Sequence, residues 1–374
     1  MSQTPLRFKP AQHDNFIKTL RKRVNEYFTQ QNTNQYANTE MVIKSIVLIS
    51  FWIGSYVLVV ATNVSPLLKY IQWVLLGLSV ALVTVNVGHD AIHGSFSRKK
   101  WINALLSHTF NLNGASAYMW TKMHNGAHHT YTNVHGYDED IESLPILRLS
   151  PETKLKKIHK HQYWYSFLFY GLATLSWVFI KDYVKFFKNS VGNYNNKKHP
   201  KKEYFYLFFY KFTYYFLFIV VPFLTLDLAW YHILLGFLLS HFVEGFYLAV
   251  VFMLAHVVED THFPMPSTEG SIENTWAIHQ LYTTANFSSK SRLMFYLTGG
   301  LNLQVEHHLF PNICSIHYMP LAQIVHETAH EFGLPYINYE KFGGAFVSHI
   351  RFLKEIGRID RYKPVLRKQF LPVS

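Results

Sequence analysis

Four runs of mostly apolar residues, each about long enough to cross a lipid bilayer, constrain this chain more than any other feature. They cover residues 41–62, 70–88, 204–226 and 230–255, and a helix of about 20 apolar residues spans the hydrocarbon core. The composition agrees, since 49% of the residues are hydrophobic and only 16% are charged. A short turn joins the first run to the second, and another joins the third to the fourth. We therefore expect an all-α membrane protein with four transmembrane helices in two hairpins.

A fifth apolar run, 163–180, has two possible interpretations. It is long enough to span the membrane, but it begins with Tyr and Trp and has basic residues on both sides. Aromatic and basic residues of this kind are typical of a helix that lies in the membrane interface. We expect this second arrangement, because a fifth span would separate the histidine clusters described below onto opposite sides of the membrane.

The distribution of Lys and Arg predicts the orientation and the division of the chain. Basic residues concentrate before the first run, between the second and third, and near the C-terminus, which places these parts on the cytoplasmic side. We expect a cytosolic N-terminal segment (1–40), a membrane domain (41–350) and a basic C-terminal tail (351–374). The N-terminal segment lacks the apolar core and cleavage site of a secretory signal.

Charge and cysteine content exclude several classes of function. The net charge is +12, but the cations are spread over loops that border apolar runs, and no basic module with interleaved aromatic residues stands out. We therefore expect no nucleic-acid partner. Cys314 is the only cysteine, so the chain has no disulfide framework and no thiolate metal site of the usual kind. Any metal must be bound by imidazole, carboxylate or amide groups.

Eight of the 22 histidines are candidate metal ligands, because they occur in short-spaced clusters next to apolar runs. Residues three to five positions apart on a helix lie near one face, and converging imidazoles suit Zn, Cu, Fe or Ni. Isolated histidines such as His199 and His349 are expected to be unremarkable surface or loop residues. The eight candidates are His89, His93, His124, His128, His129, His256, His307 and His308.

Several other polar residues lie beside these histidines. We expect the carboxylates among them to hold imidazole rings in one tautomer, although Glu139 could equally be a solvated acid. Inside the fourth run, His241 and Glu244 are more simply a hydrogen-bonded pair that packs two spans. The possible ligands or supporting residues are Gln304, Asp90, Asn125, Asp138, Asp140 and Glu306.

One further motif favours a different chemistry. HETAH, at 326–330, matches the H-E-x-x-H signature of zinc metalloproteases, in which the Glu is a general base. The alternative interpretation is a surface helix. A histidine-lined metal transporter is a non-enzymatic alternative, but its ligands would lie near the bilayer midplane rather than at span ends.

Four motifs together resemble those of a known family. HDAIH at 89–93, HNGAHH at 124–129 and QVEHH at 304–308 resemble the three histidine boxes of the integral-membrane fatty-acid desaturases, and AHVVED at 255–260 places His256 at an additional ligand position of that family. The third box begins with Gln304, and in this it resembles the third box of the front-end, acyl-lipid type. A di-iron membrane hydroxylase of fatty acyl chains or alkanes is the nearest alternative, since it shares the boxes.

The resemblance implies a four-span bundle with a cytosolic helical cap, two iron ions bound by the eight histidines, and O2 as co-substrate. The activity that it implies is the introduction of a double bond into the acyl chain of a lipid or acyl-CoA. Front-end members usually carry a fused cytochrome b5 domain with an HPGG motif, which is not found before residue 41. We therefore expect electrons from a separate carrier, either a ferredoxin or free cytochrome b5. This also favours a bacterial inner membrane, with the endoplasmic reticulum as the alternative.

Overall fold

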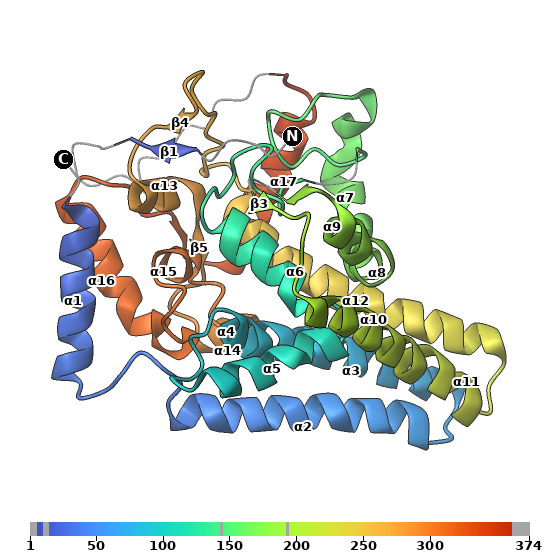
Figure 1. The fold of residues 1–374 in the computed structure, drawn as a ribbon. Coiled ribbons are helices and arrows are strands. Elements are labelled where there is room, and N and C mark those ends of the chain that lie inside the picture. Colours follow the sequence, from blue (N-terminus) through green and yellow to red (C-terminus); the bar gives the residue numbers. More distant parts are fainter. Residues whose placement is uncertain (1–5, 10–14, 143–144, 192–193, 361–374) are drawn as a thin grey trace.

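The computed structural model describes residues 6–9, 15–142, 145–191 and 194–360, and its architecture is helical. Figure 1 shows four long helical segments running side by side, with the remaining helices gathered at one end. Four segments are long and apolar enough to cross a membrane: α2 (Thr39–Ala61), Pro66–Ile92, Lys201–Thr225 and α12 (Trp230–His256). The expected all-α membrane fold with four helices in two hairpins is confirmed.

The second and third segments each contain a π-helical stretch. The second consists of α3 (Pro66–Val83), η1 (Thr84–Gly88) and α4 (His89–Ile92), and the third of α10 (Lys201–Tyr215), η5 (Phe216–Val220) and α11 (Val221–Thr225). The second segment was expected to end at Gly88. It continues through His89 because the π turn carries the helical hydrogen bonds onward, so His89 lies on the helix and not beyond it.

The helices at the end of the bundle that is predicted to be cytoplasmic form a cap that includes the N-terminal segment. Helix α1 (Phe16–Gln30) packs against α16 (Tyr318–Glu331) around a shared apolar core, and Arg23 binds Glu331 at 2.7 Å. The other helical elements of the cap and its connections are α5 (Lys100–Leu112), α6 (Ala117–Thr121), η2 (Lys122–His128), η3 (Lys157–His161), α13 (Trp276–Thr283), α14 (Arg292–Thr298), α15 (Gln304–Leu309), η6 (Ser315–His317) and α17 (Phe342–Ile356).

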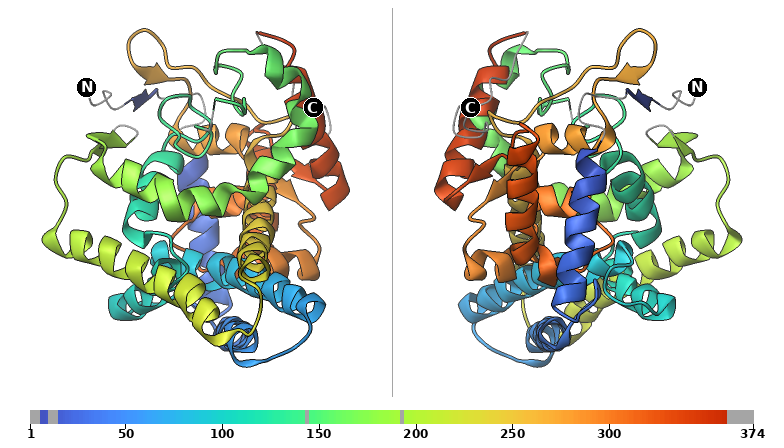
Figure 2. Two further views of the ribbon diagram at one scale, coloured as in Figure 1. Left: turned by 90° about the vertical axis from the view of Figure 1, so that its right-hand side faces the viewer. Right: turned by 90° about the vertical axis from the view of Figure 1, so that its left-hand side faces the viewer.

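Two pairs of short parallel strands join distant parts of the chain. These are β1 (Arg7–Phe8) with β4 (Ser271–Ile272) and β5 (Asn286–Phe287) with β6 (Asn338–Tyr339); β2 (Ser190–Val191) and β3 (Tyr194–Asn195) form a local antiparallel pair. Both described chain ends lie at the same end of the molecule (Figure 2). Helix α17 runs without a break across residue 350, where the basic tail was expected to begin, and residues 361–374 of that tail lie outside the described part.

Close packing of α3 and α12 forms the centre of the bundle. A Cβ added at Gly77 would lie 2.3 Å from the backbone oxygen of Ser240, and one at Gly236 would lie 2.3 Å from the Trp73 ring. Glycine at these two positions therefore allows the helices to approach closely, as small residues do in membrane bundles. Helix α2 packs outside them on α3 and exposes Ile43, Ile46 and other apolar side chains.

The fifth apolar run is bent and is not one straight helix. It forms α7 (Gln162–Gly171), α8 (Ala173–Ser176), η4 (Trp177–Lys181) and α9 (Asp182–Phe187), with a 57° bend near Leu172. Lys211 of α10 holds its second half through Asp182 Oδ2 at 2.8 Å and the carbonyl of Val178 at 2.8 Å. By length and composition the described residues contain four spans, or five if the bent pair crosses as one. The interfacial arrangement therefore stays a prediction.

Candidate metal centre

Two of the three histidine clusters lie on or directly after π-helical turns. The first cluster follows η1, and the second lies on η2. In η2 the amide of His129 donates to the carbonyl of His124 over 3.0 Å, which is an i to i+5 bond. The wider π turn leaves His124 and His129 side by side, with their Nε2 atoms 3.2 Å apart. The helical face expected for this cluster is thus formed by a π-helix.

The eight candidate histidines meet at the junction of the bundle and the cap. Their ligand atoms form a four-histidine group and a three-histidine group, and within each group all atoms lie within 4.8 Å of one another. His129 lies between the groups, with its ring centroid 4.6 Å from that of His307 and 4.3 Å from that of His308. The four-histidine group is His89, His93, His124 and His307, and the three-histidine group is His128, His256 and His308.

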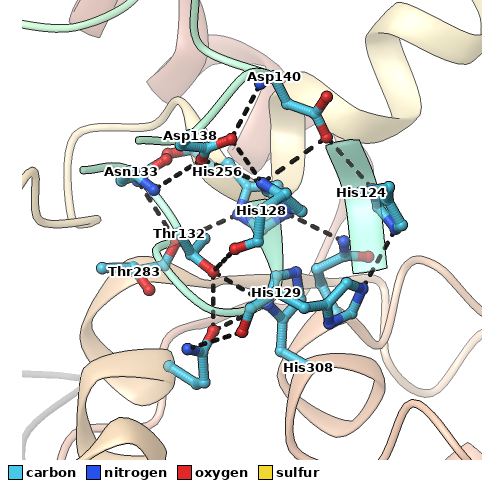
Figure 3. A network of polar contacts seen from close by, with 12 residues as sticks. His124, His128, His129, Thr132, Asn133, Asp138, Asp140, His256, Thr283 and His308 are labelled. Atoms are coloured by element: carbon cyan, nitrogen blue, oxygen red, sulfur yellow. Dashed lines mark hydrogen bonds and ion pairs between the residues drawn. The ribbon is translucent and has the colours of Figure 1, made fainter. Parts of the chain in front are cut away.

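Carboxylates hold two of these rings from behind (Figure 3). The Nδ1 of His128 lies 3.0 Å from Asp138, and the Nδ1 of His124 lies 3.2 Å from Asp140. A proton on Nδ1 leaves the Nε2 lone pair free to bind a metal, which is how outer partners orient histidine ligands. The predicted roles of Asp138 and Asp140 as ring partners agree with these contacts. Asp140 also forms a third possible metal-binding group with His124 and His128.

Neutral groups hold three further rings, and sequence reasoning missed these partners. The Nδ1 of His308 lies 2.8 Å from Gln280 Oε1, that of His256 lies 3.2 Å from the carbonyl of Thr283, and that of His307 lies 3.2 Å from the Tyr318 hydroxyl. None of these residues belongs to a histidine cluster, and only the folded chain brings α13 and α16 to the centre. No pattern in the sequence singled them out.

Several ring nitrogens that face the centre have no protein partner. Within the described part of the chain, the buried Nε2 atoms of His93, His128, His307 and His308 make no hydrogen bond, and neither nitrogen of His89 does. A buried polar atom without a partner costs roughly 1–3 kcal/mol. Several such atoms that face one another are accounted for if they bind metal ions.

Burial keeps most of these imidazoles neutral. Loss of solvation, followed by repulsion from neighbouring rings, lowers the pKa values of His93, His124 and His129 well below their usual range. The pKa of His128 is raised, because Asp138 and Asp140 outweigh the effect of burial. Imidazoles that are neutral at physiological pH are the form that binds transition metals.

Three of the expected supporting residues do not contact an imidazole through a hydrogen bond in the described structure. Asp90 accepts from the Ser315 hydroxyl at 2.7 Å and from the Cys314 thiol, Asn125 donates to the carbonyl of Ile92, and Glu306 accepts from Asn286 and Tyr336. The expectation that Asp90 and Glu306 fix tautomers is therefore wrong. Asp90, which follows His89, instead joins its helix to Ser315. Glu306, which precedes His307, joins α15 to Asn286 and Tyr336.

The remaining polar candidates lie in two different places, the metal centre and the interior of the bundle. Gln304 lies inside the centre, with Nε2 3.0 Å from His256 Nε2 and a buried Oε1 that has no partner among the described residues. His241 and Glu244 lie apart, within the bundle. His241 contacts the hydroxyls of Thr174 and Tyr214, and its Nδ1 is 3.7 Å from Glu244. His241 therefore joins spans through these hydroxyls, as a packing role predicts, but the expected hydrogen bond between His241 and Glu244 is not formed.

The HETAH motif does not form a metal site in the described structure. His326, Glu327 and His330 are exposed on α16, and none belongs to the three metal-binding groups found among the described residues. The interpretation as a surface helix therefore accounts for the motif. The eight buried histidines are the candidate centre.

Comparison with known proteins identifies the chemistry that belongs to this arrangement. The model of the family described as fatty acid desaturase matches residues 65–340, a range that contains all eight histidines. The chain belongs to the fatty acid desaturase family. It is an oxidoreductase that introduces a double bond into lipid acyl chains, and the resemblance of its histidine boxes is confirmed.

Curated desaturases resemble this chain over nearly its whole length. An sn-1 linoleoyl-lipid 6-desaturase of Synechocystis is 33% identical over 95% of this chain and 99% of its own length. A second enzyme of that name, from Arthrospira platensis, is 31% identical over 91% of this chain and 92% of its own. An acyl-lipid (8-3)-desaturase of Physcomitrium patens is 32% identical over 94% and 74%. The acyl-lipid type is thus the one that this desaturase resembles.

Proposed function

We propose that this desaturase is an oxygen-dependent acyl-lipid desaturase whose centre binds two iron ions, one in each histidine group. The observation that carries the proposal is the set of unpaired Nε2 atoms that face one another across the two groups. When bound, iron supplies the activation of O2 that removal of hydrogen from an unactivated methylene requires. The proposed ligands are His89, His93, His124, His128, His129, His256, His307 and His308, with Gln304 or a water completing the coordination.

The side chains around the centre would fix the metal ligands and exclude water. Trp120 stacks on His124 with ring centroids 3.9 Å apart and makes an edge-to-face contact with His89. Phe252 of α12 also makes an edge-to-face contact with His124, and Phe110 packs on Trp120. This apolar wall faces the bundle, so an acyl methylene could reach the centre without bringing water with it.

The reaction balances only with an external source of electrons. One acyl chain, one O2, two electrons and two protons give one double bond and two waters. An internal dithiol cannot supply the electrons, because Cys314 is the only cysteine of the chain. We propose a ferredoxin or free cytochrome b5 as the donor, docking on the cytoplasmic face of a bacterial inner membrane, with the endoplasmic reticulum as the alternative membrane.

Elemental analysis of the purified protein, together with lipid profiling of an expressing host, tests the proposal. We expect about two irons per chain, as the two groups of ligands imply, and new unsaturated acyl chains that reveal the position of the double bond. One zinc per chain and an unchanged lipid profile would contradict it. Hydroxylated acyl chains in place of new double bonds would identify the related hydroxylase chemistry instead.

A further inference from the structure

A groove with polar and apolar walls lies beside the first histidine cluster, where the cap meets the bundle. Its walls come from the last turns of α1, the segment 34–37 that leads into α2, and residues 96–99 before α5. Its polar lining is formed by the amides of Asn25, Asn34 and Gln35 together with Arg98 and Lys99, and its apolar lining includes Phe28, Phe96 and Ile102. No carboxylate lines it within the described part of the chain.

The two cations of this groove have no acidic partner. Arg98 and Lys99 are exposed, and neither forms an ion pair with any described residue. Lys100 follows directly and is also exposed. Amides that can donate hydrogen bonds, together with unpaired cations, match a phosphate or another anionic group.

Exposed apolar residues next to the groove indicate that it lies at the edge of the membrane. Trp101 and Leu105 of α5 are 64% and 60% exposed, and Ile43 of α2 is 57% exposed. These side chains are suited to lipid contact, and they begin within a few residues of the groove. Cations at this level meet lipid headgroups, since the charge of the cytoplasmic leaflet attracts basic residues near its surface.

An ordered loop connects the groove to the metal centre. The Asn103 side chain donates to the carbonyls of Gly94 and Ser97 and accepts from the amide of Ser97. The carbonyl of Phe96 accepts from the amide of Ala37 at 3.0 Å, which fixes the two walls to each other. His93, at the start of this loop, is half-buried, whereas the other seven candidate ligands are buried.

We propose that this groove binds the anionic headgroup of the glycerolipid whose acyl chain is desaturated, a proposal that rests on the proposed function of the centre. A headgroup held by Arg98 and Lys99 brings the carboxyl end of the chain beside His93, and the chain then continues along the apolar wall of the bundle. The lipid is thereby selected by charge at the membrane surface, before its acyl chain reaches the metal centre.

The test measures bound lipid and does not depend on turnover. The full chain is reconstituted into nanodiscs with equal amounts of phosphatidylglycerol and phosphatidylcholine that carry the same acyl chains, and the lipid retained after extraction into detergent is quantified by mass spectrometry. We expect enrichment of phosphatidylglycerol on the order of tenfold for two cations near the surface. The double variant R98Q/K99Q should lose this enrichment.

A matched double variant separates the groove from general positive charge. K160Q/R351Q removes one Lys and one Arg that are exposed and form no ion pair in the described structure. Lys160 lies on η3 and Arg351 on α17, two elements that contact each other and do not line the groove. We expect K160Q/R351Q to retain the enrichment. An equal loss in both double variants, or no enrichment in the wild type, would overturn the proposal.

Two further measurements identify the source of the anion and test the proposed function separately from the headgroup site. Coenzyme A or inorganic phosphate, added at low concentration, should not displace the retained phosphatidylglycerol; displacement by coenzyme A would assign the groove to a soluble thioester and overturn the lipid assignment. Turnover is measured in the same nanodiscs with O2 and an electron donor supplied, first reduced ferredoxin and then reduced cytochrome b5. If the wild type enriches phosphatidylglycerol but forms no double bond, the proposed function fails while the headgroup site stands.

Discussion

Asp138 and His128 form a buried pair at the back of the metal centre, with both carboxylate oxygens 3.0 Å from the ring Nδ1. Asp138 also accepts from the amides of Asn133 and Asp140, so one side chain orients a ligand and the loop that follows it. The orientation of this ligand therefore depends on the conformation of the loop that follows it.

Replacing Asp138 should therefore weaken metal binding without removing a ligand. In D138N the amide nitrogen cannot accept a hydrogen bond, and the negative charge opposite His128 is lost. We expect metal affinity or activity to fall about 10- to 100-fold, as for other partners of metal-bound histidines. Iron content and product yield would be measured together. The control is E139Q, because Glu139 is the neighbouring acid in the chain and pairs with Lys185; equal losses in the two variants would argue against an orienting role.

Removing one ligand should empty one group of histidines and leave the other. His308 supplies one of the three rings of its group, so H308A should abolish turnover and lower the iron content from about two per chain to about one. H199A is the control, since His199 contacts Tyr118 and the carbonyl of Phe186, outside the centre. Full activity in H308A would remove that residue from the proposed ligands.

Removing the acid of the HETAH motif should change little. Glu327 is exposed on α16, and its carboxylate accepts a hydrogen bond from Gln323 of the same helix. Stability effects of surface substitutions of this kind stay within about 0.5 kcal/mol, so E327Q should keep wild-type iron content, product yield and melting temperature. Loss of activity with a stable fold would reopen the hydrolase interpretation.

The sequence predicted the features that depend on residues close together in the chain. The apolar runs gave the four spans, because a crossing helix needs a length that can be read directly from the chain. The histidine spacings indicated the candidate ligands, since residues three to five positions apart share a helical face. Asp138 and Asp140 were found because they follow His128 closely enough to reach back to it.

The remaining features depend on contacts between distant segments. Gln280 and Tyr318 reach His308 and His307 only after α13 and α16 have packed in the cap. The π turns were missed because an apolar face looks much the same at either helical period. His349 was expected to be an unremarkable surface residue, but it is buried between Tyr170 and the carbonyl of Val257, since it lies on the face of α17 that packs inward with Phe352 and Leu353. A single sequence does not show which residues of distant segments contact each other.

Labelling of introduced cysteines should determine the orientation of the spans. The native cysteine is buried, so exposed positions can be tested one at a time. Lys100 and Glu327 should be on the cytoplasmic side and Asp227, in the turn before α12, on the other. A membrane-impermeant maleimide added to intact cells should therefore label D227C and leave K100C and E327C unlabelled. Labelling of E327C but not of K100C would mean that the bent pair α7–α9 crosses the membrane.

Acid should destabilise the cap partly through His349. Burial lowers the pKa of His349 to about 4 from an ordinary value of 6.5, so the unfolded chain binds a proton there at a higher pH than the folded chain. The stabilisation is fully present above pH 6.5, is lost as the pH falls toward 4, and amounts to about 3 kcal/mol. Melting temperatures in detergent across this range should fall less steeply for H349Q than for the wild type. The control is H326Q, which alters an exposed histidine of α16 and should keep the wild-type slope; an unchanged slope in H349Q would exclude His349 as a source of the acid sensitivity.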